Sequence, residues 1–240
     1  MLTVLITRPR PQGEALCEAM QAVGYKTVYF PTMDIHATTL QQAEALKKIN
    51  AADIIVFISA NAAQYASKLL AQASITARIA CIGKATAAAV KDQGLSVDIL
   101  SRSMNSEGLL ACDELQSLQG KRVLMIRGKG GREFLGQTLG RRGAHVDYLE
   151  VYERRKTTDK LDPASLEKAD IVLVTSQEGL MNLVHLIPGR SRAAFYQKTV
   201  LVSSQRLADF VCACGFLQQV VIAASPCADA LIEALQSVSN

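Results

Sequence analysis

The sequence has few aromatic residues and no long apolar run. Tryptophan is absent, and all aromatic residues together make up 5% of the 240 residues. The longest apolar runs are residues 54–58, 171–174 and 220–224. A membrane helix needs roughly 20 apolar residues in succession. We therefore expect no membrane span, although 49% hydrophobic residues are enough to build a substantial core.

The sequence also lacks a strong excess of charge of one sign. Its 26 basic and 22 acidic residues leave a net charge of +4, with no basic block and no basic strip interleaved with aromatic residues. This pattern does not indicate a nucleic-acid-binding protein. The slight positive excess suits a small acidic ligand, although charge alone favours an ordinary solvated surface. Residues 2–6 lead directly into Thr7-Arg8-Pro9, without the features of a signal peptide, so we expect a cytoplasmic protein.

Patterns typical of metal and nucleotide sites are missing as well. Among six cysteines only Cys212 and Cys214 are close, and their spacing fits neither a redox pair nor a zinc site; the three histidines stand far apart. Residues 127–133 do not match G-x-G-x-x-G, because Glu133 replaces the third glycine. Lys84 and Lys129 follow glycines, as the lysine of a phosphate-binding loop does. That loop also requires a serine or threonine directly after the lysine, and neither position has one. We expect no metal, no nucleotide and no other cofactor.

What the sequence does contain is an internal repeat. Leu-Ile-Thr-Arg at 5–8 is echoed by Met-Ile-Arg at 125–127, and aligning Arg8 with Arg127 gives an offset of 119 residues, at which Gly24 meets Gly143. Residues 53–59 and 170–176 share an Asp-apolar-Ser pattern at an offset of 117. Two offsets of nearly equal size indicate a duplicated unit.

Each half reads as strand, helix, glycine and strand. The run at 3–7 is followed by a helical stripe formed by Leu16, Ala19, Met20 and Val23, after which Gly24 predicts a left-handed helix end. Gly94, Gly143 and Gly215 repeat this signal, and Ser225-Pro226 predicts the start of the last helix. Alternating strands and helices predict parallel sheets with helices on both faces. We expect an α/β protein with about five strands per half, in the flavodoxin-like doubly wound order.

Small, hydroxylated or basic residues follow the predicted strands. Ligands of open parallel sheets gather at the carboxyl ends of the strands, where helix N-termini favour carboxylate or phosphate. Six junctions, at 7–9, 59–61, 83–86, 127–131, 175–176 and 203–206, are almost free of acid. A single serine there can be a plain helix cap, but six such junctions predict a cleft between two domains that binds a ligand with several carboxylates. The candidate binding residues are Arg8, Ser59, Thr86, Arg127, Gly128, Thr175, Ser176, Ser203 and Ser204.

Five motifs give the chain a family resemblance. They are Leu-Ile-Thr-Arg-Pro at 5–9, Cys-Ile-Gly-Lys-Ala-Thr-Ala at 81–87, residues 123–133, Gly-Ala-His-Val at 143–146 with Val-Tyr-Glu-Arg at 151–154, and Val-Thr-Ser at 174–176. In this order they resemble the uroporphyrinogen-III synthase family. The resemblance implies two flavodoxin-like doubly wound parallel-sheet domains joined by a two-stranded linker. Domain one would comprise residues 1–34 and 157–240, domain two residues 38–150, and the linkers residues 32–37 and 150–156.

The resemblance also implies a reaction. Members of this family are cyclising hydro-lyases of tetrapyrrole and heme biosynthesis. They convert hydroxymethylbilane, a linear tetrapyrrole with several carboxylates, into uroporphyrinogen III, inverting the last pyrrole ring and releasing water. We expect the chain to work as a monomer, with hydroxymethylbilane as its ligand and the upstream hydroxymethylbilane synthase as a candidate partner.

The family pattern assigns roles to individual residues. Tyr152 matches the candidate proton donor, since a phenol is protonated at neutral pH; the alternative is a packing residue with a bonded hydroxyl. Thr86 matches the threonine of the family's G-x-x-T-A motif, which implies a contact with an acetate or propionate. In the second half Leu207 takes the threonine's place, so either Ser203 and Ser204 supply the hydroxyl or that contact is absent.

Two other functions compete with this interpretation. A hinge-linked binding protein that clamps an acidic small molecule without chemistry would have nearly the same sequence features. A nucleotide-dependent enzyme is disfavoured by the failed glycine motifs.

Overall fold

The structure is a computed structural model, which describes residues 1–103, 105–131 and 133–238; Arg132 of the glycine-rich motif lies outside these residues. The chain divides into two compact units. Unit 1 contains Met1–Ile35 and Arg155–Asn240, and unit 2 contains His36–Arg154. Among the described helices, none has both the length and the apolar character to cross a bilayer.

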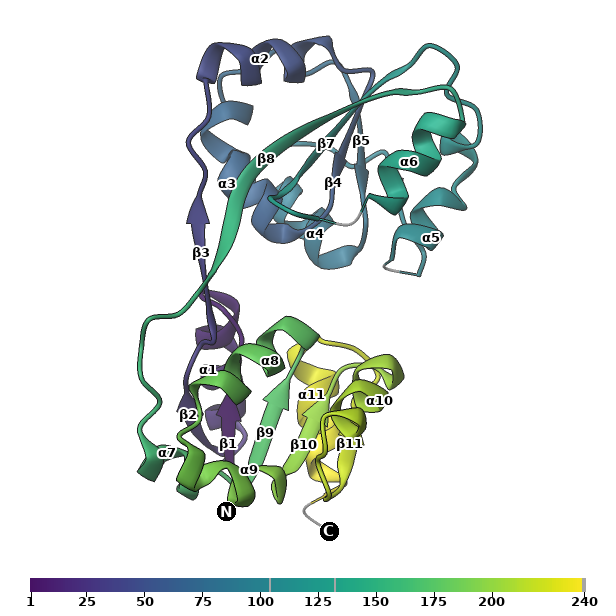
Figure 1. Cartoon of the computed structure of the whole chain (residues 1–240). Coiled ribbons are helices and arrows are strands. Elements are labelled where there is room, and N and C mark those ends of the chain that lie inside the picture. The colour runs from purple at the N-terminus through teal and green to yellow at the C-terminus, as the bar shows by residue number, and fades with distance from the viewer. Residues whose placement is uncertain (104, 132, 239–240) are drawn as a thin grey trace. The chain divides into compact units, whose positions relative to one another are not determined.

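Unit 1 is a sheet with helices on both faces (Figure 1). Its strands, all parallel, are β1 (Thr3–Ile6), β2 (Lys26–Tyr29), β9 (Ile171–Val174), β10 (Thr199–Val202) and β11 (Val220–Ile222), in the order β11-β10-β9-β1-β2. Its helices are α1 (Gln12–Ala22), α7 (Pro163–Lys168), α8 (Gln177–Leu186), α9 (Arg192–Tyr196), α10 (Gln205–Ala213) and α11 (Ala228–Gln236), with a 3₁₀ turn at Gly189–Ser191. The core on one face packs against α1 and α11, and the core on the other face against α7 to α10.

Unit 2 has the same layered design. Its strands are β3 (Met33–Ala37), β4 (Ile54–Phe57), β5 (Arg78–Cys81), β6 (Ile99–Leu100), β7 (Arg122–Gly128) and β8 (His145–Lys156), in the order β3-β8-β7-β4-β5-β6. Its helices are α2 (Gln42–Ala51), α3 (Ala60–Leu70), α4 (Lys84–Lys91), α5 (Ser106–Leu110) and α6 (Phe134–Arg141), with a 3₁₀ turn at Asp113–Leu115. The core beneath α5 and α6 includes alternate residues of β4 and β7, such as Val56 and Met125.

The chain passes between the units through β3 and β8, the two segments that contain both unit boundaries. Backbone bonds join Thr38 N–H to the Val151 carbonyl and Thr157 N–H to the Thr32 carbonyl. Thr32 is thus bonded to Thr157, and Thr38, six residues later, is bonded to Val151, six residues earlier. The two segments therefore run antiparallel. The other strand pairs of unit 2 are parallel.

The duplication and the strand order fit together. Unit 1 joins β1 and β2 of the first half to β9, β10 and β11 of the second, whereas unit 2 joins β7 and β8 of the second half to β4, β5 and β6 of the first. Counted in this way, five strands of each sheet have the order 2-1-3-4-5 of flavodoxin-like folds, and β3 adds a sixth strand at the edge of unit 2. This order confirms the predicted fold class. A carboxylate contact is duplicated too: Asp53 accepts the N–H of Arg122, and Asp170 accepts the N–H of Thr3, both at 2.8 Å.

The helix ends test the local predictions. Gly24, Gly94, Gly143 and Gly215 all have positive φ, as predicted. The predicted start of the last helix is wrong: α11 begins at Ala228, because the Ser225 hydroxyl accepts the N–H of Cys227 and forms a turn instead of a cap. Val23, predicted on the buried stripe of α1, follows the end of the helix and is 51% exposed.

Candidate functional site

The predicted binding residues gather at the carboxyl ends of the central strands. In a 2-1-3-4-5 sheet, the chain reverses direction across the sheet between the first and third strands, and ligands bind outside the strands at this switch point. In unit 1 this point lies between β1 and β9, which are followed by Arg8, Thr175 and Ser176. In unit 2 it lies between β7, which ends with Arg127 and Gly128, and β4, which Ser59 follows closely. The structure thus sorts most of the candidates into two groups, one in each unit.

Three of the predicted serines cap helices at these strand ends. Ser59, Ser176 and Ser204 are the N-caps of α3, α8 and α10. Their hydroxyl oxygens accept the N–H groups of Ala62 at 3.1 Å, Gly179 at 3.0 Å and Leu207 at 3.4 Å, respectively. The N-terminus of a helix carries about half a positive charge, which favours an anion nearby. Thr175 and Ser203 directly precede two of these caps and are half-buried.

The two positions of the family's threonine differ between the units. Thr86 is buried in the first turn of α4, whose N-cap Gly83 has no side chain to offer. Leu207 is buried in the first turn of α10, where the hydroxyl of the N-cap Ser204 accepts its N–H. The hydroxyl at this position is therefore present in unit 2 and replaced by apolar packing in unit 1.

Arg8 ties together three segments of unit 1. Its Nη1 donates to the carbonyl of Pro226 at 2.9 Å, and its Nη2 donates to Oε1 of Gln12 at 3.1 Å. Burial lowers the pKa of the Arg8 guanidinium from its ordinary value. The side chain thus holds the end of β1 against α1 and the loop after β11.

Arg127 is surrounded by acceptors in unit 2. Its Nη2 donates to Glu133 at 2.9 Å and to Glu150 at 3.1 Å, its Nη1 donates to the Gly131 carbonyl at 3.3 Å, and its guanidinium lies 4.0 Å from the ring centroid of Tyr148. Only 8% of the Arg127 side chain is exposed. Two carboxylates more than neutralise one guanidinium, so its main effect is to hold the loop after β7 against β8 and the start of α6.

The same cluster shifts two neighbouring groups. The hydrogen bond from Arg127, followed by the bond from the Tyr148 hydroxyl, lowers the pKa of Glu133. Burial, followed by the bond to Glu133, raises the pKa of Tyr148. Both shifts favour the arrangement seen here, a charged carboxylate beside a neutral phenol.

Tyr152 is packed at the switch point of unit 2. Its hydroxyl lies 3.1 Å from the Ser59 hydroxyl, and its ring centroid is 5.7 Å from that of Tyr65 in α3. A Cβ added at Gly128 would stand 2.5 Å from Cζ of Tyr152, so the ring rests directly on the glycine. Arg154 lies on another side, with its guanidinium 5.9 Å from the ring centroid. The residue is 3% exposed.

A β-bulge aims Tyr152 at this position. Strands β7 and β8 pair residue by residue as far as Arg127 and Glu150, but the next pair is Gly128 and Tyr152, so Val151 is an extra residue in β8. Side chains alternate between the faces of a strand, and an unbroken β8 would place Tyr152 on the same face as Glu150 and the Arg127 cluster. The bulge resets this alternation and turns the phenol toward α3.

The duplicated unit has no phenol at the matching position. At the offset of 119 residues Tyr152 corresponds to Met33, which is buried near Gly179 and the capping Ser176. Tyr148 does have a counterpart, Tyr29, whose hydroxyl donates to the Arg8 carbonyl at 3.2 Å. Burial raises the pKa of Tyr29 to about 12. At these matching positions, unit 2 places the phenol of Tyr152 beside the capping Ser59, whereas unit 1 places Met33 near the capping Ser176.

A cavity of about 320 Å³ opens at the same strand ends of unit 2. Ile58 and Ile82, which follow β4 and β5, give it apolar walls together with Met125 and Leu135. Arg127, Arg154, Ser106, Gly130 and Gly131 supply its polar lining. Apolar walls with a few polar groups suit a small ring that bears a charged substituent.

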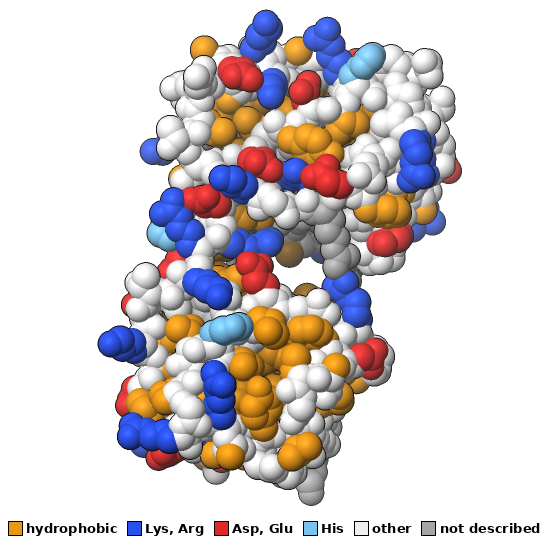
Figure 2. All heavy atoms as spheres, in the orientation of Figure 1, with side chains coloured by type: hydrophobic (Ala, Val, Ile, Leu, Met, Phe, Trp, Pro, Cys, Tyr) orange, Lys and Arg blue, Asp and Glu red, His pale blue; other side chains and the backbone are white. Residues whose placement is uncertain are grey.

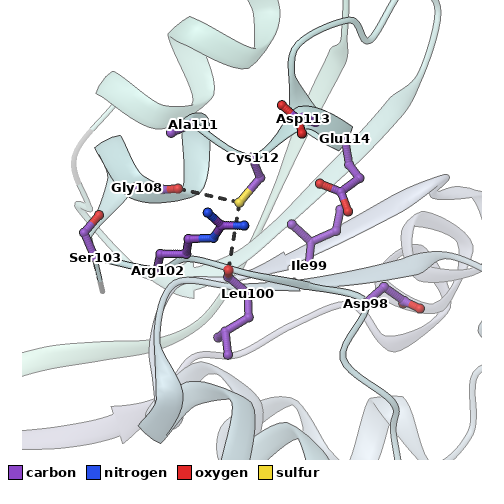
Figure 3. A pocket seen from close by; sticks show the side chains of 10 residues that line it. All are labelled: Asp98, Ile99, Leu100, Arg102, Ser103, Gly108, Ala111, Cys112, Asp113 and Glu114. Atoms are coloured by element: carbon purple, nitrogen blue, oxygen red, sulfur yellow. Dashed lines mark hydrogen bonds between the residues drawn. The ribbon is translucent and has the colours of Figure 1, made fainter.

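A second cavity of unit 2, of about 490 Å³, has a different chemistry (Figure 3). It lies beside β6, with the side chain of Arg102 near Cys112, whose thiol lies 3.6 Å from the Gly108 carbonyl. Asp98, Asp113 and Glu114 also line it. These acids oppose an anionic ligand, so this cavity does not match the ligand that the strand ends favour.

Within the described residues, no group of three or more His, Cys, Asp or Glu side chains is arranged to hold a metal ion.

Sequence reasoning missed the residues that surround the candidates. Tyr65 and Glu150 were not singled out, and Arg154 was named only as part of a family motif, because each becomes relevant through a contact with Tyr152 or Arg127. Extending the repeat at the offset of 119 residues would have paired Tyr29 with Tyr148.

On the face shown in Figure 2, basic and acidic side chains are interspersed on both units.

The fold and these strand ends define a class: an α/β protein of two doubly wound units, with serine-capped helices at the switch points. Comparison with known proteins then supplies the family. The sequence model of a family described as uroporphyrinogen-III synthase HemD matches residues 14–233. The uroporphyrinogen-III synthases of Salmonella typhimurium and Escherichia coli are each 34% identical to this chain, over 98% of it and 100% of the relative. The chain belongs to the uroporphyrinogen-III synthase family.

Solved structures agree on the fold. A uroporphyrinogen-III synthetase from Helicobacter pylori matches with a TM-score of 0.68 and 17% identity, over 99% of both chains. A mutant uroporphyrinogen III synthase from Thermus thermophilus matches with a TM-score of 0.66 and 14% identity, over 100% of this chain and 98% of the other. The family is one of cyclising lyases in heme biosynthesis, so the binding-protein alternative is not favoured.

Proposed function

We propose that this chain closes hydroxymethylbilane to uroporphyrinogen III, with inversion of the last pyrrole ring and loss of water. The observation that carries the proposal is the phenol of Tyr152, held by a helix cap at the switch point of an anion-favouring sheet. Family membership supplies the reaction, and the strand ends supply a surface suited to a polycarboxylate. The candidate binding residues remain Arg8, Ser59, Thr86, Arg127, Gly128, Thr175, Ser176, Ser203 and Ser204.

The chemistry divides between substrate and protein. In the proposed path, Tyr152 gives its proton to the terminal hydroxyl as the carbon–oxygen bond breaks, which releases water and leaves an electron-poor azafulvene. A substituted carbon of the last ring attacks it to form a spirocyclic intermediate, which fragments and recloses. The phenolate recovers its proton when the macrocycle regains its aromatic pyrroles. General acid assistance contributes about 10²–10⁴-fold, and orientation of the reacting ends up to about 7–11 kcal/mol.

The surroundings favour binding that is spread over many contacts. Helix N-termini capped by Ser176 and Ser204 offer N–H groups and positive dipoles to carboxylates. The 320 Å³ cavity at the ends of β4, β5 and β7 combines apolar walls with Arg127 and Arg154, and suits one pyrrole ring with an acidic substituent. Arg8 and Arg127, already engaged by protein acceptors, act mainly by holding their loops.

The same proposal extends to the setting of the enzyme. The reaction has one small-molecule substrate, and we propose a monomer that works in the cytoplasm without a cofactor. Hydroxymethylbilane synthase, which forms the substrate, is the candidate partner.

The decisive experiment supplies freshly prepared hydroxymethylbilane to the purified chain and separates the products by isomer. Closure without an enzyme gives the type I isomer, so type III product identifies the activity. A protein that binds hydroxymethylbilane but yields only the type I isomer would support the binding-module alternative instead.

A further inference from the structure

We propose that Ser59, one of the candidate binding residues named above, is instead a positioning residue for Tyr152 and not a ligand of the substrate. This inference rests on the proposed function. Two contacts carry it. The Ser59 hydroxyl oxygen accepts the N–H of Ala62 at 3.1 Å, and it lies 3.1 Å from the hydroxyl oxygen of Tyr152. The serine thus connects the N-terminus of α3 to the phenol.

Counting donors and acceptors allows either hydroxyl to donate to the other, and the proposed function selects the direction. A serine hydroxyl has one proton to donate and two lone pairs. The N–H of Ala62 occupies one lone pair of Ser59. If Tyr152 donated to the remaining lone pair, its proton would be committed to the protein. When Ser59 donates instead, the proton of Tyr152 is left for the substrate, and this is the arrangement that proton donation requires.

The same bond strengthens as the reaction proceeds. When the phenol gives up its proton, the bond from Ser59 ends on a phenolate, and a bond to an ionised group is roughly twice as strong as a neutral one. The positive end of the α3 dipole lies at the same place and also favours the developing negative charge. Because this stabilisation is larger in the transition state than in the bound substrate, removing it lowers kcat and leaves KM nearly unchanged.

The surroundings hold both partners still. The cap fixes the Ser59 side chain, while Gly128, Tyr65 and the extra residue of β8 fix the ring of Tyr152. In unit 1 the equivalent cap, Ser176, holds α8 in the same way, but the position of the phenol is taken by Met33. The capping of α8 therefore accounts for the serine at position 176. The capping of α3 does not account for the contact between the hydroxyls of Ser59 and Tyr152.

The test is a cycle of Ser59→Ala, Tyr152→Phe and the double variant, assayed for type III product. We expect Ser59→Ala to lower kcat about tenfold and to change KM less than about twofold, and Ser59→Thr to restore most of kcat because it keeps the hydroxyl. The double variant should be no slower than Tyr152→Phe alone, because Ser59 acts through the phenol. Asp162→Ala, which removes the cap of α7 in unit 1, is the matched control for loss of a cap and should leave kcat unchanged.

Three results would overturn the inference. In the first, the losses from the two single changes multiply in the double variant. In the second, Ser59→Ala raises KM while kcat is retained, which would make the serine a substrate ligand. In the third, unfolding free energies over the same cycle show no coupling between the two side chains, a result that does not depend on activity. If the unaltered chain makes no type III product, the proposed function fails, whatever the unfolding cycle shows.

Discussion

Gly128 leaves the space that the ring of Tyr152 fills: a Cβ at position 128 would stand 2.5 Å from Cζ of the tyrosine. The two residues also form the first pair after the bulge between β7 and β8. The glycine that ends one central strand thus sets the position of the phenol on the next strand, which leads to the first prediction.

Gly128→Ala should displace Tyr152. Overpacking of this kind costs about 1–3 kcal/mol, and a misplaced donor should lower kcat by about tenfold or more. Urea unfolding and the type III assay measure the two effects. Gly140→Ala is the control, because a Cβ there, in α6, meets no atom within 4 Å and should stabilise the fold by about 0.4–1 kcal/mol. Normal turnover in Gly128→Ala would show that the ring position does not matter.

Tyr152→Phe separates a proton donor from a packing residue. The change keeps the ring and removes the hydroxyl that contacts Ser59, so unfolding should lose only about 0.5–1.5 kcal/mol. If the phenol donates, kcat should fall at least about tenfold, or about 1.4 kcal/mol, with KM little changed. Tyr196→Phe, in the aromatic cluster of α9, controls for loss of a phenol elsewhere. Unchanged turnover would reject the acid role, and a large loss of stability would favour packing.

Ser176→Asp tests anion recognition without loss of the cap. Aspartate caps helices as well as serine does, so the unfolding free energy should stay within about 0.5 kcal/mol of that of the unaltered chain. A negative charge at this helix N-terminus should repel substrate carboxylates and raise KM about tenfold or more, and added salt should reduce the rise. Gln41→Asp, at the N-cap of α2, places the same charge away from the predicted residues and should leave KM unchanged. A normal KM in Ser176→Asp would remove α8 from the binding surface.

Acid should destabilise the fold through its paired carboxylates. The backbone N–H of Arg122 lowers the pKa of Asp53, the bond from Arg127 lowers that of Glu133, and the hydroxyl of Ser165 lowers that of Asp162. A carboxyl whose folded-state pKa is depressed contributes stability above its unfolded pKa, and this is lost as pH falls through the folded value. Urea midpoints should therefore hold down to about pH 5 and fall below about pH 4. Glu133→Gln should make this fall shallower than in Glu18→Gln, an exposed control in α1.

Activity should survive exhaustive dialysis against a chelator. The sequence contains neither nucleotide loops nor close groups of metal ligands, and the proposed reaction is driven by the electron-rich pyrroles of the substrate. The type III assay before and after dialysis measures this. Complete loss of activity that added metal restores would contradict the prediction.

Much of the fold could be predicted from the sequence, because its signals are local. Apolar runs such as 54–58 and 171–174 became buried central strands, and Gly24 and Gly143 ended helices with positive φ, since these features depend on nearby residues. The repeat also predicted a duplicated unit, whereas the exchange of strands between the halves was implied only by the family resemblance. Local signals failed at Ser225, where two helix-start residues instead formed a turn.

The candidate site depended on tertiary structure to a greater degree. The sequence by itself determined which hydroxylated and basic residues follow the strands, and the family resemblance singled out Tyr152. Only the folded chain decided that Arg127 is occupied by Glu133 and Glu150, and that an extra residue in β8 turns Tyr152 away from them toward Ser59. The physical reason is that two of these contacts, Arg127 with Glu150 and Tyr152 with Ser59, join residues 23 and 93 positions apart. Their geometry depends on strand register and on a bulge, which the order of residue types along one strand does not specify.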